Sequence, residues 1–176
     1  MPEKRTHILG ILANAIEMEY EGKAFFQDVA SKSKHQRTKD TFASLAKQEQ
    51  RHVDILSEEL RQMNEGKTWG SLEELKTSAP QSPKISVFKD KDIKRIKLDP
   101  NAGELDALKL GIEIEKKSIE YYRSAGSQMH DEKARELFNW LVGEEGGHLT
   151  ILSAEYEYRN RSGFYYDNME FSLEVM

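Results

Sequence analysis

Two copies of one short motif are the residues of this chain best suited to chemistry. The motif is Glu-x-x-His, present as Glu49 to His52 and again as Glu145 to His148. Residues three apart on an α-helix lie on one face, so each carboxylate points the same way as its imidazole. Carboxylate and imidazole together suit iron, manganese or zinc. The chain contains no cysteine, which excludes a thiolate nucleophile, Cys-ligated zinc and an iron–sulfur centre.

An internal repeat links the two motifs. The second motif follows the first by 96 positions, and the same offset pairs residues 16–19 (Ile-Glu-Met-Glu) with residues 112–115 (Ile-Glu-Ile-Glu). The offset also pairs apolar and aromatic residues, namely Phe26 with Tyr122, Phe42 with Phe138 and Leu45 with Leu141. One unbroken offset predicts two helix-turn-helix halves related by a pseudo-two-fold axis, with equivalent residues meeting at that axis.

Helical periodicity extends over four stretches, which are Arg5 to Ser31, Lys34 to Asn64, Gly103 to Gln128 and Asp131 to Arg159. Only a few residues join the first stretch to the second and the third to the fourth, which predicts two antiparallel hairpins. Residues 65–102 are interrupted by Gly and Pro and predict a long crossover along the outside, with a short helix at Ser71 to Lys76. The predicted fold is an all-α four-helix bundle within residues 1–160.

Two segments outside these helices have their own interpretations. Residues 161–176 form a C-terminal tail whose aromatic stretch, Gly163 to Phe171, is predicted to be non-helical. We expect this tail to pack on the bundle or on a dimer partner. The basic run Lys89 to Lys97 lies in the crossover and is interpreted as a solvated surface, with docking of an acidic electron-transfer partner as the alternative.

The apolar pattern predicts that four glutamates and two histidines face the core. Glu49 and His52, for example, share a helix face with Phe42, Leu45 and Leu56. A buried, unpaired carboxylate costs several kcal/mol, so four of them could exceed the roughly 5 to 15 kcal/mol stability of a domain. Two divalent ions balance four carboxylates and leave the imidazoles as neutral ligands. The predicted metal ligands are Glu19, Glu49, His52, Glu115, Glu145 and His148.

The same residues also have a simpler interpretation. Glutamate is abundant, so two Glu-x-x-His pairs can arise by chance, and the chain would then be an inert helical interaction module. The shared register, and a glutamate at the matching place on each remaining helix, favour the metal site. His7, His35 and His130 lie outside the pattern, near helix ends, and are predicted to be surface or capping residues.

Composition argues against several other classes of protein. The net charge is -5 and the pI about 5.6, whereas binding nucleic acid requires a concentrated positive surface. No stretch approaches the roughly 18 apolar residues of a membrane-spanning helix, so we expect no membrane partner. The N-terminal residues do not resemble a secretory signal, so a cytoplasmic location is expected.

The motifs resemble those of the rubrerythrin group of the ferritin-like superfamily. The resemblance covers residues 5–159 and rests on Glu19-x-x-Gly22-x-x-x-Phe26, Glu49-x-x-His52, Glu115-x-x-Ser118-x-x-x-Tyr122 and Glu145-x-x-His148. It implies a ferritin-like fold and a centre of two iron ions, in which Glu49 and Glu145 bridge the metals. Glu19 and Glu115 are then terminal ligands, and each motif histidine binds one metal.

Two departures from the family pattern affect the expected activity. Rubrerythrins proper usually carry a Cys-ligated rubredoxin domain, so this cysteine-free chain resembles the rubredoxin-free branch. They also tend to have an additional glutamate on the third helix, where this chain has Ser118, so less efficient peroxide reduction is expected. Tyr122 lies on the same face as Glu115 and is expected to fill the core, to hydrogen-bond a ligand or to donate an electron.

The segment Gly143 to His148 carries three glycines between and beside two predicted ligands. Each glycine inside a helix costs about 1 kcal/mol relative to alanine, so a compensating reason is expected. Close helix packing or a local bulge is the favoured interpretation. The alternative is that the missing side chains leave room for an oxidant near the metals.

Together these features predict a di-iron oxidoreductase. Two Fe(II) ions give electrons to peroxide or dioxygen, and an external electron-donor protein reduces the ions again. The predicted catalytic residues are Glu49, Glu145 and Tyr122. The alternative is a ferroxidase or iron-handling protein of the ferritin type, in which the same centre oxidises Fe(II) and passes it on for storage. The resemblance also implies a homodimer.

Overall fold

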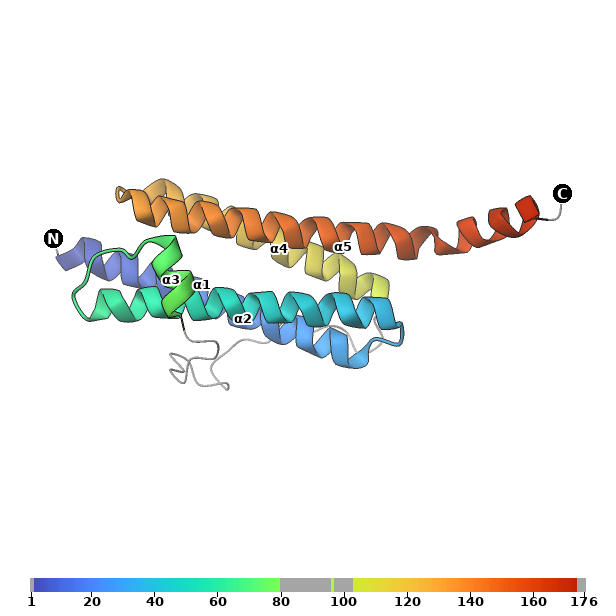
Figure 1. The fold of residues 1–176 in the computed structure, drawn as a ribbon, viewed down its shortest axis with the longest axis horizontal. Helices are drawn as coiled ribbons and strands as arrows, with labels where there is room; N and C mark the ends of the chain where they lie inside the picture. The colour runs from blue at the N-terminus through green and yellow to red at the C-terminus, as the bar shows by residue number, and fades with distance from the viewer. Residues whose placement is uncertain (1, 80–95, 97–102, 174–176) are drawn as a thin grey trace.

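The protein is an all-α bundle of four long helices and one short helix (Figure 1). The computed structural model describes residues 2–79, 96 and 103–173, and no strand occurs among them. The helices are α1 (Pro2–Lys32), α2 (Gln36–Asn64), α3 (Leu72–Ser78), α4 (Glu104–Gln128) and α5 (Glu132–Leu173). None of these helices combines the length and apolar composition that crossing a lipid bilayer requires.

Two antiparallel hairpins make up the bundle, as the short connections predicted. Helix α1 packs mainly on α2 and α4 mainly on α5, while smaller contacts of α1 with α4 and of α2 with α5 join the hairpins. The short predicted helix of the crossover is α3, whose N-cap Ser71 forms a capping box with Glu74. The basic run Lys89 to Lys97 lies, except for Ile96, outside the described residues.

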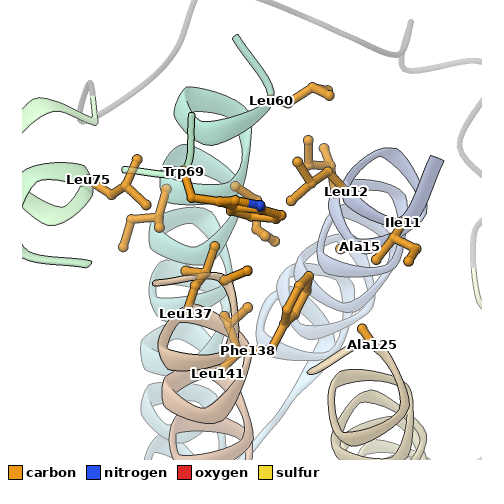
Figure 2. Close-up of a cluster of buried hydrophobic side chains, with 14 of the residues drawn as sticks. Ile11, Leu12, Ala15, Leu60, Trp69, Leu75, Ala125, Leu137, Phe138 and Leu141 are labelled. Carbon is orange, nitrogen blue, oxygen red and sulfur yellow. The ribbon is translucent and has the colours of Figure 1, made fainter. Parts of the chain in front are cut away.

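The core divides into two apolar clusters at different heights of the bundle. One includes Leu12, Trp69 and Phe138 (Figure 2), and the other includes Phe26 and Phe42, whose ring centroids are 5.8 Å apart. Burying each large apolar side chain contributes about 1.5 to 3 kcal/mol, so these clusters hold the four helices together. Along α1 and α2, the predicted ligands Glu19, Glu49 and His52 lie between the residues of the two clusters.

Helix α3 breaks the symmetry that the internal repeat predicts. Ile55 of α2 and Ile151 of α5 occupy equivalent positions, but Ile55 is fully buried and Ile151 is 45% exposed. The difference arises because Leu75 of α3 and Trp69 of the preceding loop belong to the same apolar cluster as Ile55. The insertion in the crossover therefore buries the outer face of α2, whereas the equivalent face of α5 stays exposed at Ile151.

The last helix is longer than the sequence pattern indicated. Helix α5 continues to Leu173, so the prediction of a non-helical stretch from Gly163 to Phe171 is wrong. No proline follows Glu132, and the single Gly163 costs a helix only about 1 kcal/mol. Packing of residues 161–176 on the bundle or on a dimer partner stays a prediction.

The buried carboxylate of Glu59 gives a test of this packing. Its Oε2 accepts a hydrogen bond of 3.2 Å from the Gly70 N–H, while its Oε1 has no hydrogen-bond partner. Burial raises the pKa of Glu59 from its ordinary value to about 7. The folded state therefore binds more protons than the unfolded state between about pH 4.5 and pH 7, and stability falls as pH rises through this range.

We expect the substitution E59Q to stabilise the protein at pH 8 and to leave its stability little changed at pH 4. The ionised carboxylate costs up to about 3 kcal/mol above pH 7, and the neutral amide removes that cost. Urea unfolding of both proteins at pH 4, 6 and 8 measures the difference. The exposed Glu136 provides the control E136Q, and a pH-independent difference for E59Q would contradict the expectation.

Candidate metal centre

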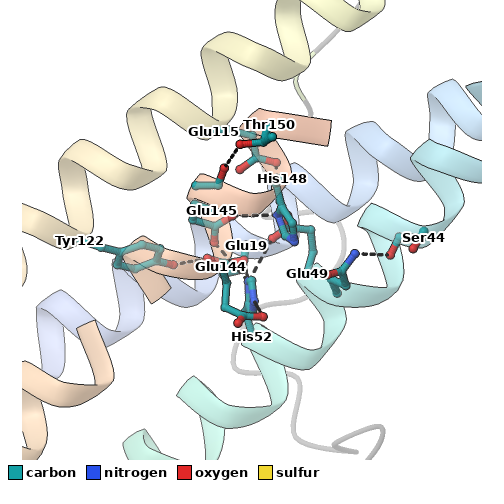
Figure 3. A network of polar contacts seen from close by, with 12 residues as sticks. Glu19, Ser44, Glu49, His52, Glu115, Tyr122, Glu144, Glu145, His148 and Thr150 are labelled. Carbon is teal, nitrogen blue, oxygen red and sulfur yellow. Dashed lines mark hydrogen bonds and ion pairs between the residues drawn. The ribbon is translucent and has the colours of Figure 1, made fainter. Parts of the chain in front are cut away.

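The six predicted ligand residues lie together in the middle of the bundle (Figure 3). Helix α1 provides Glu19, α4 provides Glu115, and α2 and α5 each provide one Glu-x-x-His pair. All six side chains are buried, so the predicted inward orientation is confirmed. Their positions follow from the spacing of the motifs, because each carboxylate or imidazole replaces an apolar residue on the buried face of its helix.

One group of ligand atoms surrounds His52. Its Nδ1 lies 3.2 Å from Glu19 Oε2, 3.2 Å from Glu145 Oε1 and 3.6 Å from Glu49 Oε2. One oxygen or nitrogen from each of these four residues lies within 4.8 Å of the others. Three carboxylates and an imidazole at this separation are a suitable ligand set for a divalent transition metal.

A second group surrounds His148. Its Nδ1 lies 2.9 Å from Glu145 Oε2, 3.1 Å from Glu49 Oε1 and 3.4 Å from Glu115 Oε1. Glu49 and Glu145 belong to both groups, whereas Glu19 and Glu115 belong to one group each. The arrangement is therefore two adjacent candidate metal positions that share two carboxylates.

Several buried polar atoms of the site have no hydrogen-bond partner. They are Glu49 Oε1, Glu115 Oε1, both carboxylate oxygens of Glu145, and both ring nitrogens of His148. Leaving one buried polar atom unpaired costs about 1 to 3 kcal/mol. Except for His148 Nε2, the unpaired atoms are carboxylate oxygens of the ligand residues or the His148 nitrogen that faces them. Metal ions would supply the missing partners, so the residues present fit a two-metal centre.

Burial and neighbouring charges shift the pKa values of the ligand residues. Burial, with help from neighbouring carboxylates, raises the pKa of Glu19 well above its usual range and that of Glu115 to about 9. Burial opposes ionisation of Glu145 too, but the close approach of both histidines holds the pKa of Glu145 below its ordinary value. The carboxylates raise the pKa of His52, and they raise that of His148 to about 12, although burial favours neutral imidazoles.

Tyr122 lies beside the centre, as its position on the α4 face predicted. The side chain is fully buried, and its hydroxyl donates a hydrogen bond to Glu19 Oε1. Its ring also packs against Phe138 at 6.2 Å between centroids. Tyr122 therefore both fills the core and fixes one carboxylate of the His52 group, and its electron-donating role stays a prediction.

Two residues near His52 were not predicted from the sequence. Glu144 Oε2 lies 3.9 Å from His52 Nε2, and the Trp140 ring meets the His52 ring edge-on at 5.5 Å between centroids. The approach of His52 lowers the pKa of Glu144. Glu144 and Trp140 precede His148 by four and eight positions, a little more than one and two turns, at the border of the inward face. This spacing could have indicated that both side chains lie near the centre. It does not show which of the other helices they face.

The three remaining histidines do not join the centre. His35 is the N-cap of α2, and its Nδ1 lies 2.6 Å from Glu104 Oε2 at the bundle end. His7 hydrogen-bonds Gln128 on the surface, and His130 is exposed. The prediction of surface or capping residues is confirmed for these three.

The favoured interpretation of the glycines near the centre is wrong. A Cβ atom at Gly143, Gly146 or Gly147 would meet no atom of another element within 4 Å, so no helix packs closely there. The α-helix also continues through this segment without a bulge. Gly143 and Gly147 are exposed, so these two glycines face away from the core and not toward a neighbouring helix, as the favoured interpretation required.

Comparisons with known proteins agree with this geometry. The family model for rubrerythrin matches residues 10–156. A hypothetical protein from Pyrococcus furiosus is 23% identical with a TM-score of 0.64, over 86% of this chain and 89% of its own. An uncharacterised conserved protein from Magnetospirillum magnetotacticum is 22% identical with a TM-score of 0.56, over 84% and 91%. At such identities these structures support the fold alone. No curated protein matches the sequence.

We expect binding of two divalent ions at pH 7 to release about four protons per chain. Because the pKa values of Glu19, Glu115, His52 and His148 are raised, we expect each to hold a proton without metal and to lose it on becoming a ligand. Calorimetric titration with Zn²⁺ in buffers of different ionisation enthalpy counts these protons. Affinity should fall as pH falls, and release of one proton or none would contradict the charge balance described above.

Proposed function

Because this chain belongs to the rubrerythrin family, we propose that it is a di-iron oxidoreductase that reduces peroxide or dioxygen. The single observation that carries the proposal is the pair of four-residue groups that share Glu49 and Glu145. Two ions that share ligands can pass two electrons to one oxidant, which is what cleavage of an O–O bond requires. When bound, the iron pair supplies these electrons and acts as a Lewis acid.

The residues of the centre have different proposed roles. Glu49 and Glu145 would bridge the two positions, because each belongs to both groups. Glu19 and Glu115 are terminal ligands, one for each position. His52 and His148 would bind a metal through Nδ1, the ring nitrogen that faces the carboxylates in both groups. Manganese or zinc fits the same ligands, and the proposal of iron rests on the family.

The surrounding protein holds the centre in a dry and fixed geometry. Apolar clusters above and below it, including Phe26 and Leu56, limit the access of water. Tyr122 holds a proton at its hydroxyl and presents it to Glu19, which orients that carboxylate. Since the chain has no cysteine, we propose that electrons come from an external donor protein.

A ferroxidase or iron-handling role is the second candidate function. The observation that favours it is Ser118, a buried residue on α4 at the place where rubrerythrins tend to carry an additional glutamate. Without a carboxylate there, the centre has fewer ligands to hold an ion after oxidation. The oxidised ion would then leave more readily, as iron handling requires.

The test is anaerobic addition of Fe(II) followed by peroxide or by dioxygen, without a reductant. We expect one peroxide to oxidise two Fe(II) per chain, consuming two protons and yielding two waters, and the reaction then to stop. Replacing Glu49 or Glu145 by Ala should lower the rate of Fe(II) oxidation by at least about 100-fold, because both metal positions lose a shared ligand. The exposed Glu136 gives the control E136A.

The outcomes separate the two candidates. Continued oxidation of excess Fe(II), with ferric iron released, would favour the iron-handling role over the oxidoreductase. Wild-type rates in both E49A and E145A would mean that the shared carboxylates do not form the reactive centre. Retained oxidation in E136A shows that loss of activity is not a general effect of removing a glutamate.

A further inference from the structure

The two histidines of the centre have matching inner surroundings but different outer surroundings. In each ring, Nδ1 faces the shared carboxylates. On the outer side, His52 Nε2 lies 3.9 Å from Glu144 Oε2, whereas His148 Nε2 is buried without a hydrogen-bond partner. The pseudo-two-fold symmetry of the ligands therefore does not extend to the residues behind them.

The internal repeat explains how this difference arises. The offset of 96 positions pairs Glu144 of α5 with Gln48 of α2, and Trp140 with Ser44. Gln48 turns along its own helix and its Nε2 donates to the Ser44 carbonyl oxygen at 3.5 Å (Figure 3). The half that carries His148 therefore has a carboxylate, Glu144, which faces His52, whereas the half that carries His52 has an amide at the equivalent place.

A carboxylate at this place changes the properties of a ligand imidazole. When Nδ1 binds a metal, the ring proton is on Nε2, and an acceptor facing that proton fixes the tautomer and the ring orientation. The distance of 3.9 Å between Glu144 Oε2 and His52 Nε2 is longer than a direct hydrogen bond. Because the Glu144 side chain is 39% exposed, it has room for a small rotation or one bridging water that would close the gap.

We propose that Glu144 makes the two metal positions unequal, so that the ion bound by His52 is held more tightly than the ion bound by His148. Glu144 is a positioning residue in this proposal, because it acts on the ion through the His52 ring. The inference rests on the two-metal centre of the proposed function and adds an order of binding to it. The first ion to bind occupies the position of Glu19 and His52.

A lysine lies close to Glu144 and Trp140. Lys76 of α3 places its amine 4.3 Å from the centre of the Trp140 ring, and its charge also lowers the pKa of Glu144. The lysine therefore offsets part of the negative charge that Glu144 adds near the centre. What remains specific to Glu144 is the contact with Nε2 of His52.

The test is calorimetric titration of the metal-free full-length protein with Zn²⁺, which is redox-inert. We expect two binding events in the wild type, separated by about tenfold or more in affinity. The substitution E144Q reproduces the residue of the other half and should weaken only the tighter event, by about 10- to 100-fold. The control is Gln48→Ala, which should leave both affinities unchanged because Gln48 contacts its own helix.

A double-mutant cycle shows whether Glu144 acts through His52. In the His52→Ala background, adding E144Q should have no further effect on the remaining event, whereas in the His148→Ala background it should keep its full effect. The absorption bands of bound Co²⁺ give a second measurement, since a change of the His52 ring alters only the bands of the first ion.

Different results overturn the inference and the proposed function. Fewer than two ions bound by the wild type would refute the two-metal centre and the inference with it. Two ions of equal affinity, or an E144Q protein with both affinities unchanged, would overturn the inference alone. Equal weakening by E144Q in both histidine backgrounds would also overturn it, because Glu144 would then act by its charge.

Discussion

Burial of four carboxylates and two imidazoles in one space is the constraint on which the rest of this structure depends. The six side chains lie between two apolar clusters, so water cannot compensate their charge. The raised pKa values of two glutamates and both histidines favour protons on these four groups when no metal is bound, and these protons would balance the remaining carboxylates. With two divalent ions, the four ionised carboxylates balance the metals. The same cavity is thus neutral in two states, and exchange of protons for metal connects them.

The bundle is the means by which these groups reach one another. Each of the four long helices contributes one carboxylate, and α2 and α5 each add a histidine about one turn later. Pairing of α1 with α2 and of α4 with α5 fixes half of the centre in each hairpin. Sharing of Glu49 and Glu145 by both groups occurs only when the hairpins dock, so the complete site is a property of the whole bundle.

Departures from symmetry give the two halves different environments. Helix α3 covers the outer face of α2, which buries Ile55 and leaves the equivalent Ile151 of α5 exposed. The same helix brings Lys76 over Trp140, next to His52 and Glu144. An insertion in the crossover can therefore alter the surroundings of one metal position without changing any ligand. This is a general way for a duplicated fold to make two equivalent sites unequal.

The sequence by itself determined the four-helix pattern, the hairpins and the inward orientation of the six candidate ligands, because helical spacing and a repeat with one constant offset can be read from the order of the residues alone. The sequence analysis placed the end of the last helix too early, and it wrongly expected close packing or a bulge at the glycines of the Gly143 to His148 segment. The residue types at these places do not show which other residues lie beside them. Only the tertiary structure placed Glu144 behind His52 and left His148 Nε2 unpaired. Those contacts join different helices, and their geometry depends on how the hairpins and α3 pack.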